Sequence, residues 1–206
     1  MGGWFKKPVK TVADLKGLKM RIAGLGGEVM ARLGAIPQQL PGGDIYPALE
    51  RGVIDAAEWV GPYDDEKLGF YKIAPNYYYP GWGEACSMYS MYVNIKEWEK
   101  LPKSYQSALE VACYEANLDM MAEYDFKNPP ALQRLVKNGV KLHAYSTEIM
   151  KAAQTAAFDL YEEEAAKNPS FKKIYEPWKK FRAEQFLWVR VAEKSLIDFM
   201  LANPTK

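Results

Sequence analysis

The feature that most constrains the fold is a regular alternation of short strand signals and helix signals in the first half of the chain. The strand-like runs lie at residues 19–22, 36–40, 53–59, 76–79 and 87–94, and the helix-like stretches between them at 28–33, 44–51 and 64–71. Asp44 is the expected N-cap of the second helix. Strands joined through helices favour parallel pairing. The alternation therefore predicts an α/β fold with a mostly parallel sheet.

The second half of the chain is predicted to be helical, apart from a short strand at 140–143. Apolar residues recur at helical spacing over 103–126, and Pro129–Pro130 are expected to kink or break that helix. Helices at 147–166 and 171–201 follow. The last would be about 45 Å long, which is more than one small lobe covers. We therefore expect it to bridge two lobes or to pack on another chain.

Composition excludes several classes of partner. The chain has 206 residues, and 27 basic against 26 acidic residues give a net charge of +1, which argues against nucleic acid. No stretch approaches the roughly 20 apolar residues of a membrane span. The first residues do not resemble a signal peptide, so the chain is expected to be either cytoplasmic or an internal fragment of an exported protein. Cys86 and Cys113 are expected to be two separate buried thiols, although a disulfide is conceivable.

Enzyme signatures are weak in this sequence. Gly24–Gly27 follow a strand and open a helix as a dinucleotide loop would, but Val29 stands where the third glycine belongs. His143 is the only histidine, which leaves little for metal sites or nucleophile activation. The alternative that remains is a small metal-assisted α/β enzyme that uses Glu58 and Glu84 on a carboxylate substrate.

Polar residues at strand ends give the candidate binding site. Arg21 lies on a predicted strand, where it is costly unless it meets an anion or reaches solvent. Glu58 and Trp59 close the 53–59 strand, at the edge where α/β folds hold their ligands. Trp82 and Glu84 follow in a Gly-rich turn. Two carboxylates without histidine suit a hard cation such as Na⁺ or Ca²⁺, or they are unrelated surface acids.

Three segments together resemble one known family. Residues 11–21, which lead to Arg21, resemble the arginine-bearing segment of the solute receptors of tripartite ATP-independent periplasmic (TRAP) transporters, the DctP-type family. Residues 46–59 are similar to the helix and interlobe strand that follow. Residues 58–59 and 78–84 are most similar to the branch that binds 2-oxo and 2-hydroxy monocarboxylates, such as pyruvate or lactate, together with a metal ion.

The resemblance implies a role for each candidate residue. Arg21 would bind the carboxylate of a small organic acid, and Trp82 would line the site. Glu58, the Trp59 carbonyl and Glu84 would hold Na⁺ or Ca²⁺, and the cation would bridge to the acid. Glu58, Trp59 and Glu84 are therefore expected to contact both substrate and metal. The protein would be a binding component, not an enzyme, with no catalytic cofactor.

The resemblance also implies a fold, a location and partners. It implies a periplasmic-binding-protein-like (type II) two-lobe fold, here truncated at the amino terminus, because family members carry an export signal and about half again as much chain before this segment. The expected location is the periplasm, and the expected partners are the TRAP membrane subunits and a second copy, as a homodimer or domain-exchanged oligomer. The expected segments are 1–57 (second lobe), 58–98 (first lobe with crossing strands), 99–150 (return to the second lobe) and 151–206 (carboxyl-terminal helices).

Overall fold

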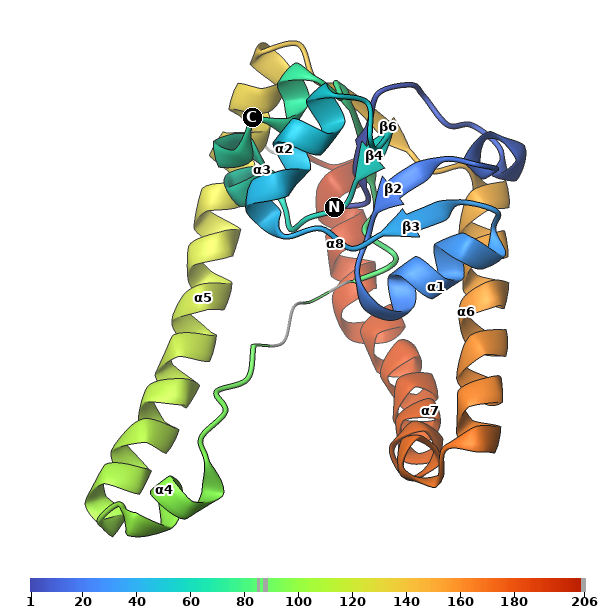
Figure 1. Ribbon diagram of the computed structural model, residues 1–206. Coiled ribbons are helices and arrows are strands. Elements are labelled where there is room, and N and C mark those ends of the chain that lie inside the picture. The colour runs from blue at the N-terminus through green and yellow to red at the C-terminus, as the bar shows by residue number, and fades with distance from the viewer. Residues whose placement is uncertain (85, 87–88, 205–206) are drawn as a thin grey trace. The chain divides into compact units, whose positions relative to one another are not determined.

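The computed structural model describes residues 1–84, 86 and 89–204. Within these residues, six strands form one sheet in the order β3-β2-β4-β1-β5-β6 (Figure 1). The strands are β1 (Gly3–Phe5), β2 (Lys19–Arg21), β3 (Ile36–Gln38), β4 (Ala56–Ala57), β5 (Asn76–Tyr79) and β6 (Lys141–Ala144). The α/β class is thus confirmed.

The sheet is mixed, and not as uniformly parallel as the alternation predicts. Strand β2 pairs in parallel with β3 and β4, and β5 pairs in parallel with β6. Strand β1 lies between β4 and β5 and is antiparallel to both. Only three residues long, β1 is too short to give a periodic signal, and this is why its insertion was not predicted.

Two predicted strands differ from the structure. The predicted strand 53–59 is reduced to β4, because the amide of Ile54 still bonds the carbonyl of Ala48 at the end of a helix. Residues 89–94 are not in a strand, and residues 87 and 88 of that prediction lie outside the described part. A strand needs a hydrogen-bonded neighbour, and no described strand pairs with 89–94.

The chain also forms helices of very different lengths. Among the described residues they are α1 (Gly24–Arg32), α2 (Gly42–Glu50), α3 (Pro62–Leu68), α4 (Ile95–Lys100), α5 (Lys103–Lys137), α6 (Thr147–Lys167), α7 (Pro169–Val189) and α8 (Ser195–Ala202), with 3₁₀ turns at Val12–Leu15 and Phe70–Lys72. The predicted cap of α2 is wrong. Pro41 is the N-cap, and Asp44 lies in the first turn, where its charge favours the helix dipole. None of the helices could span a membrane, as far as the described residues go.

Helix α5 runs without interruption through Pro129–Pro130, so the predicted break is wrong. The prolines remove backbone donors, but packing beyond them compensates. Ala131 and Leu135 are fully buried, and Arg134 forms a two-pronged ion pair with Glu66 of α3. Tertiary contacts thus stabilise the helical conformation of α5 after the prolines, where local sequence preference alone would end the helix.

The core lies around the centre of the sheet. The rings of Trp4 and Tyr77 are stacked with centroids 3.7 Å apart, and both side chains are fully buried. Around them pack apolar residues from α2, from the end of α5 and from the loops between strands: Ile45, Leu49, Ile54, Phe70, Ala74 and Leu135. This cluster gives β1 its fixed place between β4 and β5.

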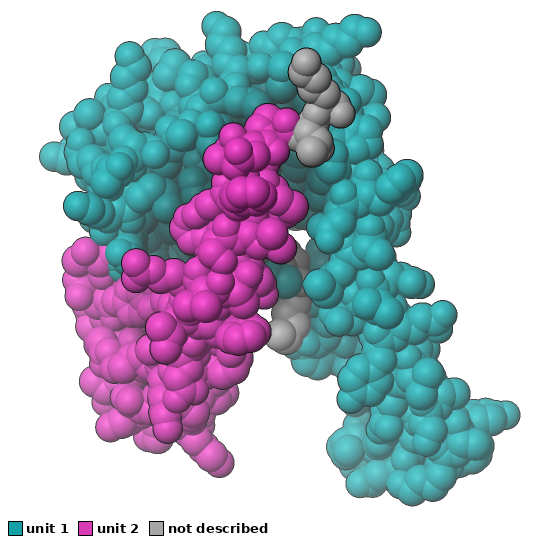
Figure 2. All heavy atoms as spheres, turned by 180° about the vertical axis from the view of Figure 1, so that it is seen from behind, with its two compact units in different colours: residues 1–154 teal, residues 155–206 magenta. Residues whose placement is uncertain are grey.

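The chain divides into two compact units, residues 1–154 and 155–206, coloured separately in Figure 2. The second unit contains the end of α6, α7, a π-helical turn at Arg190–Lys194 and α8, so the long final helix is confirmed apart from that turn. An aromatic cluster holds α6 against α7: Phe158, Tyr161, Phe171, Tyr175 and Trp178. The predicted assignment of segments to two lobes stays a prediction.

The prediction that Cys86 and Cys113 are buried is wrong, because both side chains are exposed.

Candidate functional site

Parallel pairing of β2 and β4 brings the first two site residues together. Arg21 is the last residue of β2 and lies opposite Ala57. The next amide along, that of Glu58, donates a hydrogen bond of 2.8 Å to the carbonyl of Arg21. Residues that are 37 positions apart in sequence therefore lie side by side at the carboxyl end of the sheet.

Arg21 is held in one position by main-chain and aromatic contacts. Its Nη1 donates to the Glu58 carbonyl at 2.6 Å and lies 3.5 Å from the Glu58 carboxylate. Its Nε donates weakly to the Leu40 carbonyl at 3.4 Å, and its guanidinium lies 4.7 Å from the centre of the Trp59 ring. Both charged side chains are only 12% exposed. Arg21 is thus a positioned guanidinium and not a freely solvated one.

The electrostatics of this pair are unusual. Burial raises the pKa of Glu58 to about 7; the positive charge of Arg21 opposes that rise, and the negative charge of Glu84 adds to it. Burial also lowers the pKa of Arg21, against the influence of Glu58 and Glu84. One guanidinium therefore faces the charge of two acids. A bound cation would relieve this imbalance by stabilising the ionised form of Glu58.

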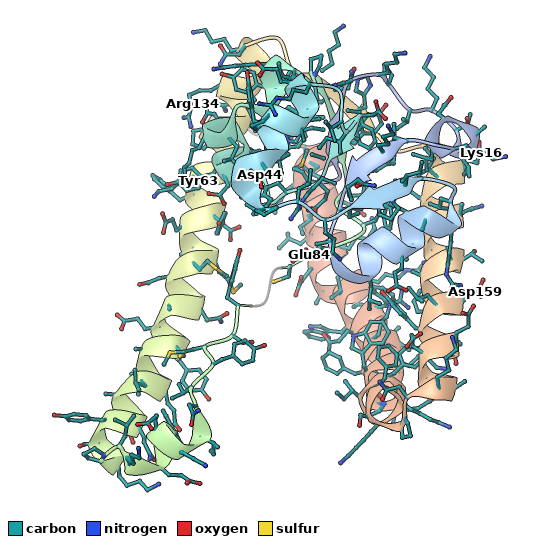
Figure 3. All side chains as sticks on the ribbon, in the orientation of Figure 1. Lys16, Asp44, Tyr63, Glu84, Arg134 and Asp159 are labelled. Carbon is teal, nitrogen blue, oxygen red and sulfur yellow. The ribbon has the colours of Figure 1, made fainter. Side chains whose placement is uncertain are left out.

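The structure places the remaining predicted residues near the same end of the sheet. Figure 3 labels Glu84 on the stretch that connects β5 to α4. Gly83 comes close to Ile22, the residue after Arg21. Trp82 is half-buried and Glu84 is exposed. The structure thus brings Glu84 within electrostatic range of Arg21 and Glu58, whereas no direct contact between Trp82 and Arg21 is described.

The Trp59 ring is fixed from the α2 side. A methyl group added to Gly42 would lie 2.7 Å from the ring. The first turn of α2 therefore packs directly on the indole, and the indole in turn supports the guanidinium. Glycine at position 42 is required by this close approach and not by a special backbone angle.

Hollows occur beside the site and elsewhere. One of about 340 Å³ opens at the carboxyl ends of β2 and β3, lined by Ile22, Glu28 and Gln39 among others. Two apolar hollows of about 430 and 450 Å³ lie between residues 89–93 and α5, and the residues that line them include none of the predicted site. The smaller hollow is the one that adjoins Arg21 in sequence and in space.

The donor set fits a hard cation only in part. Two carboxylates and a peptide carbonyl are oxygen ligands of the kind that Ca²⁺ and Na⁺ prefer. In the part of the chain that the structure describes, however, no group of three or more His, Cys, Asp or Glu residues could hold a metal. Besides Glu58 and Glu84, a cation here would therefore need main-chain carbonyls and oxygens from the ligand itself.

Sequence reasoning missed one buried acid beside the site. Asp65 of α3 is 1% exposed and accepts hydrogen bonds from the Trp4 indole, the Tyr77 hydroxyl and two amides. The available signal was the helical spacing of Pro62 and Asp65, which are both buried on one face of α3. An acid on such a face needs partners.

Comparisons with known proteins identify the relatives of this chain. A relative from Nostoc sp. strain PCC 7120, named monocarboxylate 2-oxoacid-binding periplasmic protein, is 58% identical over 199 residues, which are 97% of this chain and 55% of the relative. A TRAP transporter solute-binding protein from Bordetella bronchiseptica, solved with copurified calcium and picolinate, is 52% identical with a TM-score of 0.93; the match covers 98% of this chain and 60% of that one. A TRAP solute-binding protein from Pseudoalteromonas atlantica, solved with sodium and pyruvate, is 41% identical with a TM-score of 0.89 and coverages of 96% and 60%.

The fold is shared with these neighbours, and in this chain it carries a positioned arginine beside two acids at the carboxyl ends of β2 and β4. Residues 1–168 match the family model of bacterial extracellular solute-binding protein, family 7. The chain belongs to that family, which is the DctP-type family that the sequence resembles. It spans 55–60% of the length of the relatives compared above.

Proposed function

We propose that this chain is the ligand-binding component of a TRAP transporter and captures a small 2-oxo or 2-hydroxy monocarboxylate together with Na⁺ or Ca²⁺. The observation that carries the proposal is Arg21, a guanidinium held at the end of β2 by the Glu58 carbonyl and the Trp59 ring. The names of the relatives support the ligand class, since they include a 2-oxoacid-binding protein and structures with pyruvate or picolinate and a cation.

In this proposal each site residue has one task. Arg21 binds the carboxylate of the acid through charge-assisted hydrogen bonds. Glu58, the Trp59 carbonyl and Glu84 hold the cation, which also contacts the acid, and Trp82 lines the site. A cation next to Arg21 offsets the negative charge that the acid brings into a half-buried place. Membership of a family of solute-binding proteins favours binding over the enzyme alternative.

Ligand-dependent stabilisation tests the proposal. A ligand at 100 times its dissociation constant adds about 2.7 kcal/mol to stability, which thermal unfolding detects readily. We expect a shift with pyruvate, lactate or a longer 2-oxo acid only when Na⁺ or Ca²⁺ is also present. Arg21→Ala should abolish the shift, and Arg51→Ala, a change at an exposed position after α2, should retain it. No shift with any acid and cation would contradict the proposal for this chain.

A second copy and the TRAP membrane subunits are the proposed partners, with the periplasm as the location. The Bordetella neighbour is described as a dimer, and α7 and α8 expose large apolar side chains such as Leu187, which is 69% exposed. Exposed apolar surface of this kind favours association. Light scattering should show a dimer that Leu187→Glu weakens. If Val111→Glu on exposed α5 weakens it instead, the contact lies elsewhere.

A further inference from the structure

Asp65 is an unusual residue to find beneath a binding site. Its carboxylate is almost completely buried, and both oxygens are in use. Oδ2 accepts from the Trp4 indole at 2.8 Å and from the Tyr77 hydroxyl at 2.7 Å. Oδ1 accepts from the amides of Val60 at 3.2 Å and Gly61 at 3.1 Å. The side chain thus joins the centre of the sheet to the loop that leaves β4.

The Val60 amide is the important partner because of the peptide group to which it belongs. Its N–H shares one planar unit with the carbonyl of Trp59. The only cis peptide bond among the described residues precedes Pro80, so the unit between Trp59 and Val60 is trans. In a trans unit the C=O points away from the N–H. A hydrogen bond that fixes the Val60 amide therefore also fixes the direction of the Trp59 carbonyl.

The neighbouring peptide unit is fixed by a different side chain. Arg21 donates to the Glu58 carbonyl at 2.6 Å, which sets the plane between Glu58 and Trp59. Two consecutive peptide planes are thus held by two different charged side chains. A hydrogen bond from a peptide N–H to a carboxylate also polarises the unit and makes its carbonyl oxygen a better acceptor.

Stability alone does not account for Asp65. Burial raises the pKa of its carboxyl, and the hydrogen bonds from Tyr77, Trp4 and Val60 oppose that rise. Buried charges of this kind are often no better for stability than apolar residues of similar size. The hydrogen bonds from Trp4 and Tyr77 instead hold the carboxylate in a fixed position, because both donors belong to the stacked pair at the centre of the sheet.

We infer that Asp65 is a positioning residue for cation binding: it sets the Trp59–Val60 peptide plane so that the Trp59 carbonyl is presented as a cation ligand. The inference rests on the proposed function, in which that carbonyl binds Na⁺ or Ca²⁺. Partners that orient a metal ligand without touching the metal commonly change affinity 10- to 100-fold. Asp65 acts through the peptide and does not itself contact the cation.

The test measures amide exchange and calcium binding on the full 206-residue chain. Asp65→Ala removes both sets of hydrogen bonds, and Asp65→Asn keeps the shape of the side chain should the alanine variant fail to fold. Amide hydrogen exchange of Val60 and Gly61, measured without cation, reports whether each variant releases the loop. Calorimetry with CaCl₂ and pyruvate gives the calcium affinity.

We expect the calcium affinity of each variant to depend on whether its Val60 amide stays protected from hydrogen exchange. A variant that loses protection at Val60 should bind calcium about tenfold or more weakly. Tyr77→Phe, the matched control, removes a bond to the other oxygen of the same carboxylate and should keep Val60 protected and calcium affinity within about threefold. A variant with Val60 released and calcium affinity unchanged would overturn the inference. Absence of binding by the wild-type chain with either Ca²⁺ or Na⁺, whichever acid is added, would instead overturn the proposed function.

Discussion

Replacing Glu58 by glutamine should stabilise the cation-free protein at alkaline pH. Glu58 has a pKa of about 7 in the folded chain against 4.5 when solvated, because burial disfavours its charge. Between these values the folded state holds a proton that the unfolded state has released. Stability therefore falls as pH rises from about 4.5 to 7 and stays low above that. Glutamine resembles the protonated acid and avoids this loss.

The size of the effect follows from the shift. A displacement of about 2.5 pKa units, at about 1.4 kcal/mol each, costs the wild type about 3 kcal/mol at pH 8. The side chain is only 12% exposed, so solvent screening reduces this little. At pH 5 the difference between Glu58→Gln and wild type should shrink to less than about 1 kcal/mol. For a chain of this length, about 3 kcal/mol corresponds to roughly 6–12 °C in Tm.

The assay is thermal unfolding from pH 5 to pH 8 in the presence of a chelator. The control is Glu50→Gln, a change at an exposed position of α2. The control should follow the wild type at every pH, because its carboxylate is solvated in both states. Calcium with pyruvate should then reverse the order at pH 8, since the cation needs the ionised acid. Equal Tm values of wild type and Glu58→Gln at pH 8 without cation would refute the reasoning.

The remaining predictions concern packing. Leu135→Ala, at a fully buried position beyond the prolines of α5, should lower the free energy of unfolding in urea by about 3 kcal/mol. Val136→Ala on the exposed side should lower it by under about 1 kcal/mol. A small loss of stability in Leu135→Ala would mean that this end of α5 is not anchored. Gly42→Ala should weaken acid binding in calorimetry because its methyl group meets the Trp59 ring, whereas Gly43→Ala has open space and should leave affinity unchanged. Equal affinities would show that the indole can move freely.

The sequence predicted the elements that local signals determine. The predicted bounds are close to the observed ones for β2, β5, α6 and the final helix of α7 and α8. The position of β1 in the sheet could not be predicted, because three residues show no periodicity and the position depends on the Trp4–Tyr77 stack. Of the predicted kink or break at Pro129–Pro130, the break is wrong, because packing after the prolines overrides their local preference.

In the candidate site too, some residues could be predicted from the sequence and one could not. Arg21 and Glu58 were found because residue type and position at a strand end restrict their chemistry, and the structure brings them together through parallel pairing. Their roles in binding stay predictions. Asp65 was missed because its partners are up to 61 positions away in sequence, and only the folded chain places an indole, a hydroxyl and two amides around one carboxylate.

The frame around Arg21 is built largely from main-chain oxygens, those of Leu40 and Glu58, and Arg21 in turn accepts from the Glu58 amide. Such groups are present whatever side chain a position carries. A substitution at Leu40 that keeps the main-chain path can therefore leave its bond to Arg21 in place, whereas the contact of Arg21 with the Trp59 ring depends on the side chains at positions 59 and 42. Under the proposed function, substitutions that spare these main-chain bonds would change which acid is preferred while Arg21 keeps its place at the end of β2.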